Sequence, residues 1–475
     1  MEKLLKNIDG NLYYYGYCLK DLAKKYGTPL KITFLDIIRD RVLELKNTFD
    51  KAIKDTSYNG KFIYLNANKA NYGKEEIETA FIYSDGLEAS SYYDLLLTLD
   101  FFRSHNEKSK YIVSNGYKEK DYLDEIISAK NSGFHIIDII DSIGEYEYLK
   151  SKNIDLEVGL RLHISALYAL DDEPVKNDRF GITEDEFNYI LNDIKNTKLN
   201  LSTIHFHQRG FDYEKDKFDE NFFKVFKYYI KAKKLCDSIK YFDMGGGTPL
   251  PIDYNFDYYA WAKELLLTVK EECLKNNVEE PSIISENGKY SQKDSTINLY
   301  KVVGIKHTDA YPWHIVNGSL LIALPEMYAL GEPILVTPVN DLNHKMIKGR
   351  LAGITCDCDD IYFEKDKGYI NLPETDGLYI GLIGTGSYQN SMNGKGGVHH
   401  CLLPEEKDII EINKEFKVRH NLQTIEDIKN KKYSLRYNDY HKVKAKPVEY
   451  RDTKVILSEI NDLEEEFAKL IAKIK

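Results

Sequence analysis

Residues 61–287 alternate short strand-like runs with longer segments of helical period, and this alternation constrains the fold more than any other feature of the chain. The short runs are rich in β-branched and aromatic residues, which favour strands. They are Phe62–Leu65, Leu87–Ser90, Tyr111–Ser114, His135–Ile140, Glu157–His163, Thr203–His207, Tyr241–Met244 and Ile283–Ser285. Eight strand-plus-helix units in about 230 residues have the number and size of a TIM (β/α)8 barrel. The alternative is an open, doubly wound parallel sheet, which would need fewer strands and a reversal of strand order.

After about residue 290 the strand-like runs continue without long helices between them, which indicates a mostly β domain. These runs are Leu299–Ile305, Ile334–Thr337, Leu351–Thr355, Tyr379–Ile383 and Ile409–Ile412. Apolar residues in Val455–Lys475 recur every three or four positions, as in an amphipathic helix. We therefore expect an α/β fold in four parts. They are an N-terminal segment that packs with the β domain (1–30), a TIM barrel (31–290), a β domain (291–428) and a C-terminal extension with a helix (429–475).

Composition excludes several classes of protein. Asp and Glu number 76 against 65 Lys and Arg, a formal net charge of −11, whereas nucleic-acid-binding proteins usually present a basic patch. No run approaches the roughly 18 apolar residues of a membrane-spanning helix, and residues 1–10 are not followed by the apolar core of a secretory signal. The six cysteines include no C-x-x-C pair and are too sparse for a disulfide framework. We expect a cytoplasmic protein with no nucleic-acid or membrane partner.

Two of the predicted barrel strands are followed by residues suited to bind a carbonyl compound and an anion, at the end where barrel enzymes build their sites. Lys69 follows the first strand, and a lysine there can form a Schiff base if burial or a nearby cation lowers its pKa. Gly245, Gly246 and Gly247 follow the seventh strand and would let backbone N–H groups approach an anion. The alternatives are a solvated loop lysine and a tight turn.

The sixth and eighth predicted strands end in ionisable side chains. The sixth ends in His205 and His207, which a period of two residues directs to the same face of the strand. A buried histidine satisfied by backbone groups is the alternative. The eighth ends at Glu286, whose carboxylate can hold a proton on a ring nitrogen or form an ordinary salt bridge at the barrel mouth.

The predicted β domain contains a cysteine among carboxylates and a tyrosine on a glycine-containing loop. Cys356 is followed by Asp357, and such neighbours disfavour a thiolate, so the thiol suits a proton donor better than a nucleophile. The pair Cys356 and Cys358 lacks a second, suitably spaced pair, so we expect no metal. The hydroxyl of Tyr388, in Gly384–Gln389, can contact a phosphate or serve only in packing.

Taken in order, these motifs resemble the fold-type III pyridoxal-phosphate decarboxylases, a family that includes ornithine, diaminopimelate and biosynthetic arginine decarboxylases. The resemblance runs from about Tyr26 to Ile428. Gly86–Ser91, Gly353–Asp357 and Gly394–Pro404 look most like segments of the shorter bacterial biosynthetic arginine decarboxylases. The order of the motifs is more specific than any one of them.

The resemblance implies where the cofactor, pyridoxal 5'-phosphate, binds. Lys69 would hold it covalently, Glu88 would line the site behind Lys69, and His207 would stack on the pyridine ring. Glu286 would pair with the ring nitrogen, and Arg161 matches a position near the site in relatives.

The phosphate contacts depart in part from the family pattern. The resemblance assigns the phosphate to Gly245–Gly247 and Tyr388. Relatives usually have Gly-Ser after the stacking histidine, where this chain has Gln208-Arg209-Gly210, so Arg209 is expected to replace the hydroxyl contact. Lys289 stands where ornithine-type relatives have arginine, which keeps the charge but loses the planar fork.

The resemblance also implies the reaction and the assembly. Cys356 would protonate the substrate carbon across the interface of a homodimer with shared active sites, and Asp357, together with Asp360, would meet the basic end of the side chain. The expected reaction is decarboxylation of a basic amino acid, arginine to agmatine first, in polyamine and spermidine biosynthesis. Ornithine, lysine, diaminopimelate and carboxynorspermidine are alternative substrates. The alternative of another class is a catalytically silent, decarboxylase-like regulatory binding protein.

Overall fold

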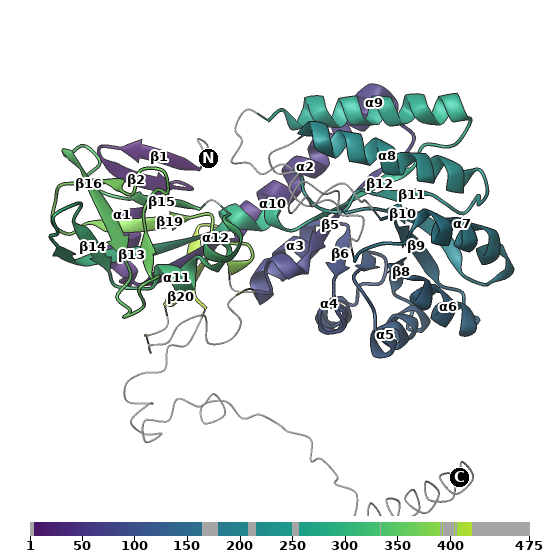
Figure 1. Cartoon of the computed structure of the whole chain (residues 1–475), viewed down its shortest axis with the longest axis horizontal. Helices are drawn as coiled ribbons and strands as arrows, with labels where there is room; N and C mark the ends of the chain where they lie inside the picture. The colour runs from purple at the N-terminus through teal and green to yellow at the C-terminus, as the bar shows by residue number, and fades with distance from the viewer. Residues whose placement is uncertain are drawn as a thin grey trace, which may run out of the picture. The chain divides into compact units, whose positions relative to one another are not determined.

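The computed structural model describes residues 4–163, 179–207, 215–248, 256–332, 334–389, 392, 403 and 406–419 (Figure 1). The helix predicted over Val455–Lys475 and the predicted phosphate contact Arg209 lie outside the described residues.

Eight parallel strands close into a barrel in the order in which they occur along the chain. They are β5 (Phe62–Ala67), β6 (Gly86–Ala89), β7 (Tyr111–Ser114), β8 (His135–Ile140), β9 (Glu157–Arg161), β10 (Asn200–His205), β11 (Tyr241–Asp243) and β12 (Ser282–Asn287). The last strand pairs in parallel with the first, with Ile283 opposite Phe62. The predicted (β/α)8 barrel is therefore confirmed, and the open sheet is excluded because the ring of strands is closed.

Helices connect successive barrel strands and cover the outside of the barrel (Figure 1). They are α3 (Lys74–Tyr83), α4 (Tyr92–Ser104), α5 (Lys120–Asn131), α6 (Ile143–Ser151), α7 (Glu184–Asp193), α8 (Lys215–Lys233) and α9 (Tyr258–Asn276). The chain leaves the barrel after β12, so the eighth position is taken by α2 (Leu35–Thr56), which precedes β5 and packs against both α3 and α9. Among the described helices, none is both long enough and apolar enough to cross a membrane.

Apolar side chains fill both faces of the barrel wall. Ile63, Leu65, Val113, Ile137 and Ile284 belong to the cluster inside the barrel, since alternate residues of each strand point inward. A larger apolar cluster lies between the strands and the helices, where the ring of Phe49 on α2 stacks on Phe62 at 3.9 Å between centroids.

The second sheet is built around the long strand β13 (Thr296–Lys306). Its other strands are β4 (Leu30–Phe34), β14 (Trp313–Val316), β15 (Leu335–Pro338), β16 (Met346–Ala352), β17 (Ile361–Tyr362), β18 (Ile370–Pro373), β19 (Tyr379–Ile383), β20 (Lys407–Ile412) and β21 (Glu415–Val418). Short helices α10 (Lys289–Gln292), α11 (Leu320–Ala323) and α12 (Pro325–Leu330) lie in the connections.

The N-terminal residues pack against this sheet. Strands β1 (Leu5–Ile8), β2 (Asn11–Tyr14) and β3 (Tyr17–Cys18) are followed by α1 (Leu19–Tyr26). Tyr14 and Leu19 share an apolar cluster with Ile297, Leu299 and Ile409 of the sheet.

All of strand β4 except Leu30 lies within the range expected for the barrel, 31–290, but the structure places the strand in the second sheet. Thr33 pairs with Thr296 of β13 on one side and with Ile410 of β20 on the other. The two neighbouring strands satisfy both edges of β4, so the chain enters the barrel domain only at α2.

Strands β6 and β7 approach so closely at Gly86 that a side chain has no room. A Cβ on Gly86 would lie 2.0 Å from the carbonyl oxygen of Tyr111, whereas the nearest atom to a Cβ on Gly144, in α6, is 3.9 Å away. We expect Gly86→Ala to lower the free energy of unfolding by about 1–3 kcal/mol or more, because one strand must shift. Gly144→Ala, the matched control, should change it by less than about 1 kcal/mol. Chemical denaturation measures both, and equal stabilities would contradict this packing.

Candidate active site

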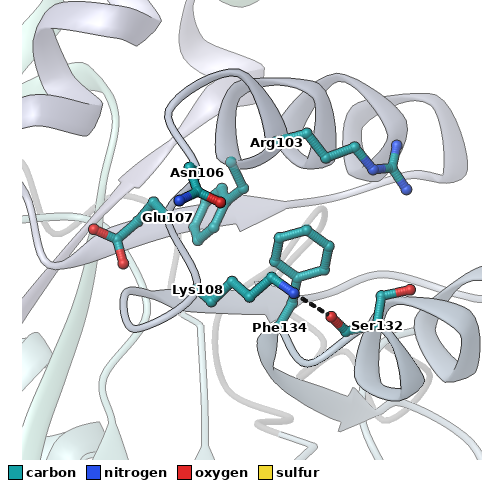
Figure 2. Close-up of a pocket in the computed structure, with 7 residues that line it drawn as sticks. Arg103, Asn106, Glu107, Lys108, Ser132 and Phe134 are labelled. Atoms are coloured by element: carbon teal, nitrogen blue, oxygen red, sulfur yellow. Dashed lines mark hydrogen bonds between the residues drawn. The ribbon is translucent and has the colours of Figure 1, made fainter.

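A hollow of about 270 Å³ lies at the end of the barrel where β7 and β8 begin (Figure 2). Its lining consists of Phe102, Arg103, Asn106, Glu107, Lys108, Ser132 and Phe134. Lys108 Nζ donates a hydrogen bond to the carbonyl oxygen of Ser132 at 2.8 Å. Barrel enzymes build their sites at the opposite end, beyond the carboxyl ends of the strands, and there the structure gathers most of the predicted residues.

Lys69 lies on the 3-10 turn Asn68–Ala70 that directly follows β5. Its Nζ is 3.3 Å from both carboxylate oxygens of Glu88, on β6, and 3.1 Å from Ser90 Oγ. Burial, the largest single influence, would lower the pKa of Lys69, but Glu88, Tyr388 and Glu286 together outweigh burial and raise the pKa above its ordinary value. Schiff-base formation was expected to require a lowered pKa of Lys69, and the structure does not meet this condition because Glu88 holds the amine as an ammonium.

Asn115, which follows β7 directly, joins two carboxylates of the site. Its Nδ2 donates to Glu88 Oε1 at 3.0 Å and to Glu286 Oε1 at 2.7 Å. Contacts therefore run from Lys69 through Glu88 and Asn115 to Glu286, across strands β5, β6, β7 and β12. Sequence reasoning missed Asn115, although its place directly after a barrel strand is the same signal that identified Lys69.

Glu286, on β12, is buried at 3% exposure. Burial would raise the pKa of this carboxyl, but His205 and Lys69 hold the pKa below its usual range, so the group is an anion. Asp243, on β11, lies beside Glu286, and its Oδ1 accepts the N–H of Gly245 at 2.9 Å. Burial and the charge of Glu286 raise the pKa of Asp243, so this second carboxyl is held neutral.

His207 and the three glycines form another wall of the site. The Nδ1 of His207 accepts the N–H of Gly246 at 3.2 Å. Burial, then the positive charges of Lys69 and Arg161, lower the pKa of His207 to about 3, so the ring is a neutral, planar surface. A Cβ on Gly246 would lie 2.8 Å from the carbonyl oxygen of Glu286, and Gly245 has a φ of +63°, so this turn requires glycine.

A loop of the β domain reaches the residues beside Lys69. The backbone N–H of Tyr388 donates to the carbonyl oxygen of Ala70 at 2.7 Å, and Asn71 Nδ2 donates to the carbonyl oxygen of Gly386 at 2.8 Å. Both bonds hold the Tyr388 loop against the segment that carries the lysine.

Lys289 is held by two carboxylates of the β domain. Its Nζ lies 3.0 Å from Glu326 and 2.9 Å from Glu332, and 6.0 Å from the centre of the Tyr388 ring. Burial would lower the pKa of Lys289, but Glu326 and Glu332 raise it, so the cation persists.

Arg161 lies at the end of β9, where its Nη1 is 3.4 Å from Asp141 Oδ2. The guanidinium groups of Arg161 and Arg179 both lie over the ring of Phe180, at 4.4 and 4.3 Å from its centre.

The remaining predicted residues lie beyond β16, in the β domain. Cys356 is exposed on the turn that follows this strand. Asp360 is buried, and its carboxylate accepts the N–H groups of Leu320 and Leu321 at 2.7 and 3.0 Å and the hydroxyl of Thr355 at 2.6 Å. Sequence reasoning expected Asp360 to meet substrate, whereas in this chain its oxygens hold the start of α11.

These features agree with what comparison with known proteins finds. The chain matches the family described as "Pyridoxal-dependent decarboxylase, pyridoxal binding domain" over residues 45–292, slightly more than half of its length, and it belongs to that family. The biosynthetic arginine decarboxylase of Prochlorococcus marinus subsp. pastoris is 27% identical over an alignment of 309 residues, and the match covers 61% of this chain and 47% of the relative. In sequence, the match thus spans about half the length of this relative and of similar arginine decarboxylases from other Prochlorococcus strains.

Solved structures share the fold of the chain over nearly its whole length. The biosynthetic arginine decarboxylase SpeA from Campylobacter jejuni superposes with a TM-score of 0.76 at 18% identity, covering 97% of this chain and 96% of that one. Diaminopimelate decarboxylase from M. jannaschii gives a TM-score of 0.73 at 19% identity, covering 90% of this chain and 96% of that one. At these identities the likeness establishes the fold.

The residues at the barrel mouth fit pyridoxal phosphate, the cofactor of the family. The aldehyde of the cofactor needs an amine, and Lys69 provides one on a side chain that is 32% exposed. The basic ring nitrogen needs an anionic partner, and the buried carboxylate of Glu286 is held ionised. The phosphate needs a backbone turn without side chains, and Gly245 and Gly246 leave no room for a Cβ.

Proposed function

We propose that the chain is a pyridoxal-phosphate-dependent decarboxylase of a basic amino acid, which converts arginine to agmatine for polyamine biosynthesis. The observation that carries the proposal is the continuous set of contacts from Lys69 to the anionic Glu286. The match to arginine decarboxylases supports arginine as the substrate. Within the described residues, Cys18, Cys236, Cys273, Cys356 and Cys358 are not joined in disulfides, which supports a reducing, cytoplasmic setting.

In this proposal each residue at the barrel mouth has a separate task. When bound, pyridoxal phosphate supplies an electron sink for the electron pair that remains after carbon dioxide leaves. The Nζ of Lys69 anchors the cofactor, and Glu286 keeps a proton on the ring nitrogen through its opposite charge. The amide of Asn115 fixes the Oε1 atoms of Glu88 and Glu286, and the neutral ring of His207 offers a flat surface for stacking.

The phosphate would lie between the glycine turn and Lys289. Gly245–Gly247 would present backbone N–H groups, and the ammonium of Lys289 would supply a positive charge near Tyr388. Arg209 is proposed as a further cation by its position after His207. Because Glu326 and Glu332 already contact Lys289, the phosphate would share this cation with them.

We further propose a homodimer in which Cys356 and Asp357 of one chain complete the site of the partner. The exposure of Cys356 on the turn after β16 supports this arrangement, because a proton donor must reach the substrate carbon. Asp357 would meet the guanidinium of arginine, for which a carboxylate is the matching bidentate partner.

Mixing two inactive variants tests the shared site. Lys69→Ala and Cys356→Ala chains, dissociated and reassociated in equal amounts, should regain about one quarter of wild-type activity, since about half of the dimers then contain one intact site of two. Each variant reassociated alone is the control and should stay inactive. If the mixture stays inactive as well although the two chains exchange, each chain uses its own Cys356 and the shared site is wrong.

A mass-spectrometric assay tests the reaction. Purified protein with added pyridoxal phosphate is incubated with arginine, ornithine, lysine, diaminopimelate and carboxynorspermidine, and the products are searched for loss of carbon dioxide. Agmatine alone is the expected result. Another amine would retain the reaction class and correct the substrate, while a colourless protein that yields no product would indicate the regulatory binding protein.

A further inference from the structure

Three ionisable side chains from neighbouring strands meet inside the barrel. They are His205 on β10, Asp243 on β11 and Glu286 on β12, with exposures of 1%, 0% and 3%. One ring nitrogen of His205 and one carboxylate oxygen each of Asp243 and Glu286 all lie within 4.8 Å of one another. Of the three, only Glu286 has a task in the proposed reaction.

The hydrogen bonds leave one oxygen of Glu286 to His205. Asn115 donates to Oε1, and the Oε2 atom lies 3.6 Å from His205 Nε2. Within the described part of the chain, neither ring nitrogen of His205 forms a hydrogen bond, and Asp243 Oδ2 accepts none. A buried polar group without a partner is costly, so a short adjustment that brings Nε2–H onto Oε2 would be favourable.

The surrounding charges define which protons the cluster holds. Glu286 and Asp243 are adjacent carboxyls in a buried site, where both cannot ionise without a large cost. The charged groups that act on His205 are Glu286, Arg161 and Asp141. Burial affects the pKa of His205 more than any of these charges and lowers it, so the ring is neutral and carries a single N–H.

We propose that His205 is a positioning residue that donates its Nε2–H to Oε2 of Glu286 and thereby makes Glu286, and not Asp243, the ionised carboxyl that would pair with the ring nitrogen of the cofactor. This inference rests on the proposed function, because the charge of Glu286 matters only if the site binds a pyridine ring. Without the donor, the negative charge is shared with Asp243, and the ring nitrogen loses part of the interaction that keeps it protonated.

Two amide variants of His205 separate donation from packing. Glutamine can place an amide N–H near the position of Nε2, whereas asparagine reaches only to about Nδ1, and both are polar and uncharged. The readout is the visible absorbance of the cofactor-loaded protein without substrate, followed across pH, because the spectrum of the ring responds to protonation of its nitrogen. Loaded Glu286→Gln provides the reference for a ring without its anionic partner.

We expect the spectrum of His205→Gln to match that of the wild type and the spectrum of His205→Asn to move toward that of Glu286→Gln. The kcat of His205→Asn should fall about 10- to 100-fold with KM changed less than about threefold, because a charge-stabilising contact is lost at the reacting ring. Identical spectra for wild type, His205→Gln and His205→Asn would overturn the inference. So would spectra of the two variants that are shifted equally from that of the wild type.

Asp243→Asn supplies an independent measurement if a His205 variant fails to fold. It removes the competing carboxyl but keeps an acceptor for Gly245, so the loaded protein should retain the wild-type spectrum over a wider pH range. A shift toward the spectrum of Glu286→Gln would overturn the inference. A wild-type chain that binds no cofactor would overturn the proposed function as well. If the spectra follow the expected order but the protein does not turn over arginine, only the assignment of arginine as the substrate is wrong.

Discussion

Replacement of Lys69 by alanine should abolish cofactor retention and lower kcat by more than about 1,000-fold, because the covalent anchor of pyridoxal phosphate is lost. The measurements are the visible absorbance that remains after gel filtration and the rate of agmatine release. The variant should fold, since Lys69 is partly exposed and, among the described residues, its Nζ forms hydrogen bonds with Glu88 and Ser90.

Two controls define what the Lys69 result means. Lys69→Arg keeps a positive charge beside Glu88 but cannot anchor the aldehyde, so it should be as inactive as Lys69→Ala. Lys108→Ala removes a lysine from the hollow at the other end of the barrel, where Nζ bonds the carbonyl oxygen of Ser132, and should keep full colour and activity. Undiminished turnover by Lys69→Ala would contradict the assignment of the site.

Glu286→Gln should lower kcat by roughly 10²–10³-fold, the usual cost of removing one electrostatic partner from a reacting centre. Glutamine keeps the size of the side chain and an oxygen that can accept the hydrogen bond from Asn115. It loses the negative charge that holds a proton on the ring nitrogen, so the electron sink weakens while cofactor binding persists. Steady-state kinetics together with the absorbance of the loaded variant measure both effects.

Glu157→Gln is the matched control for Glu286→Gln. Glu157 begins β9, at the opposite end of the barrel, and pairs with His135 and Lys240. Its substitution should alter stability and leave kcat unchanged. A kcat for Glu286→Gln within about threefold of the wild type would mean that Glu286 is a structural carboxylate, since a charge at the reacting ring is worth far more.

The strands of the barrel could be predicted because their apolar runs are contiguous in the sequence. Tyr111–Ser114 and His135–Ile140 are strands with the predicted bounds, and Tyr379–Ile383 is likewise a strand of the second sheet. Residues 31–34, which form most of β4, were placed in the barrel range because the sequence of a segment does not reveal the strands with which it pairs. Pairing joins segments that are hundreds of residues apart, and local propensity contains no information about such partners.

In the candidate site, too, some residues could be identified from local sequence and others could not. Lys69 and Glu286 were identifiable because each directly follows or ends a predicted strand, and Gly245–Gly247 because a glycine run is a local signal. Asn115 and Asp243 were missed, since an asparagine and an aspartate near strand ends have many ordinary roles. The buried environment of Asp360 was missed too, because capping depends on the backbone of α11.

By itself the sequence determined the order of the elements, the eightfold repeat of strand and helix, and the reactive groups at the carboxyl ends of the strands. Only the tertiary structure decided which of these groups meet. Closure of the barrel sets β12 beside β5, so that one amide, Asn115, contacts both Glu88 and Glu286. The charge state of each carboxyl then follows from burial and from neighbours in space, and neither is encoded in local sequence.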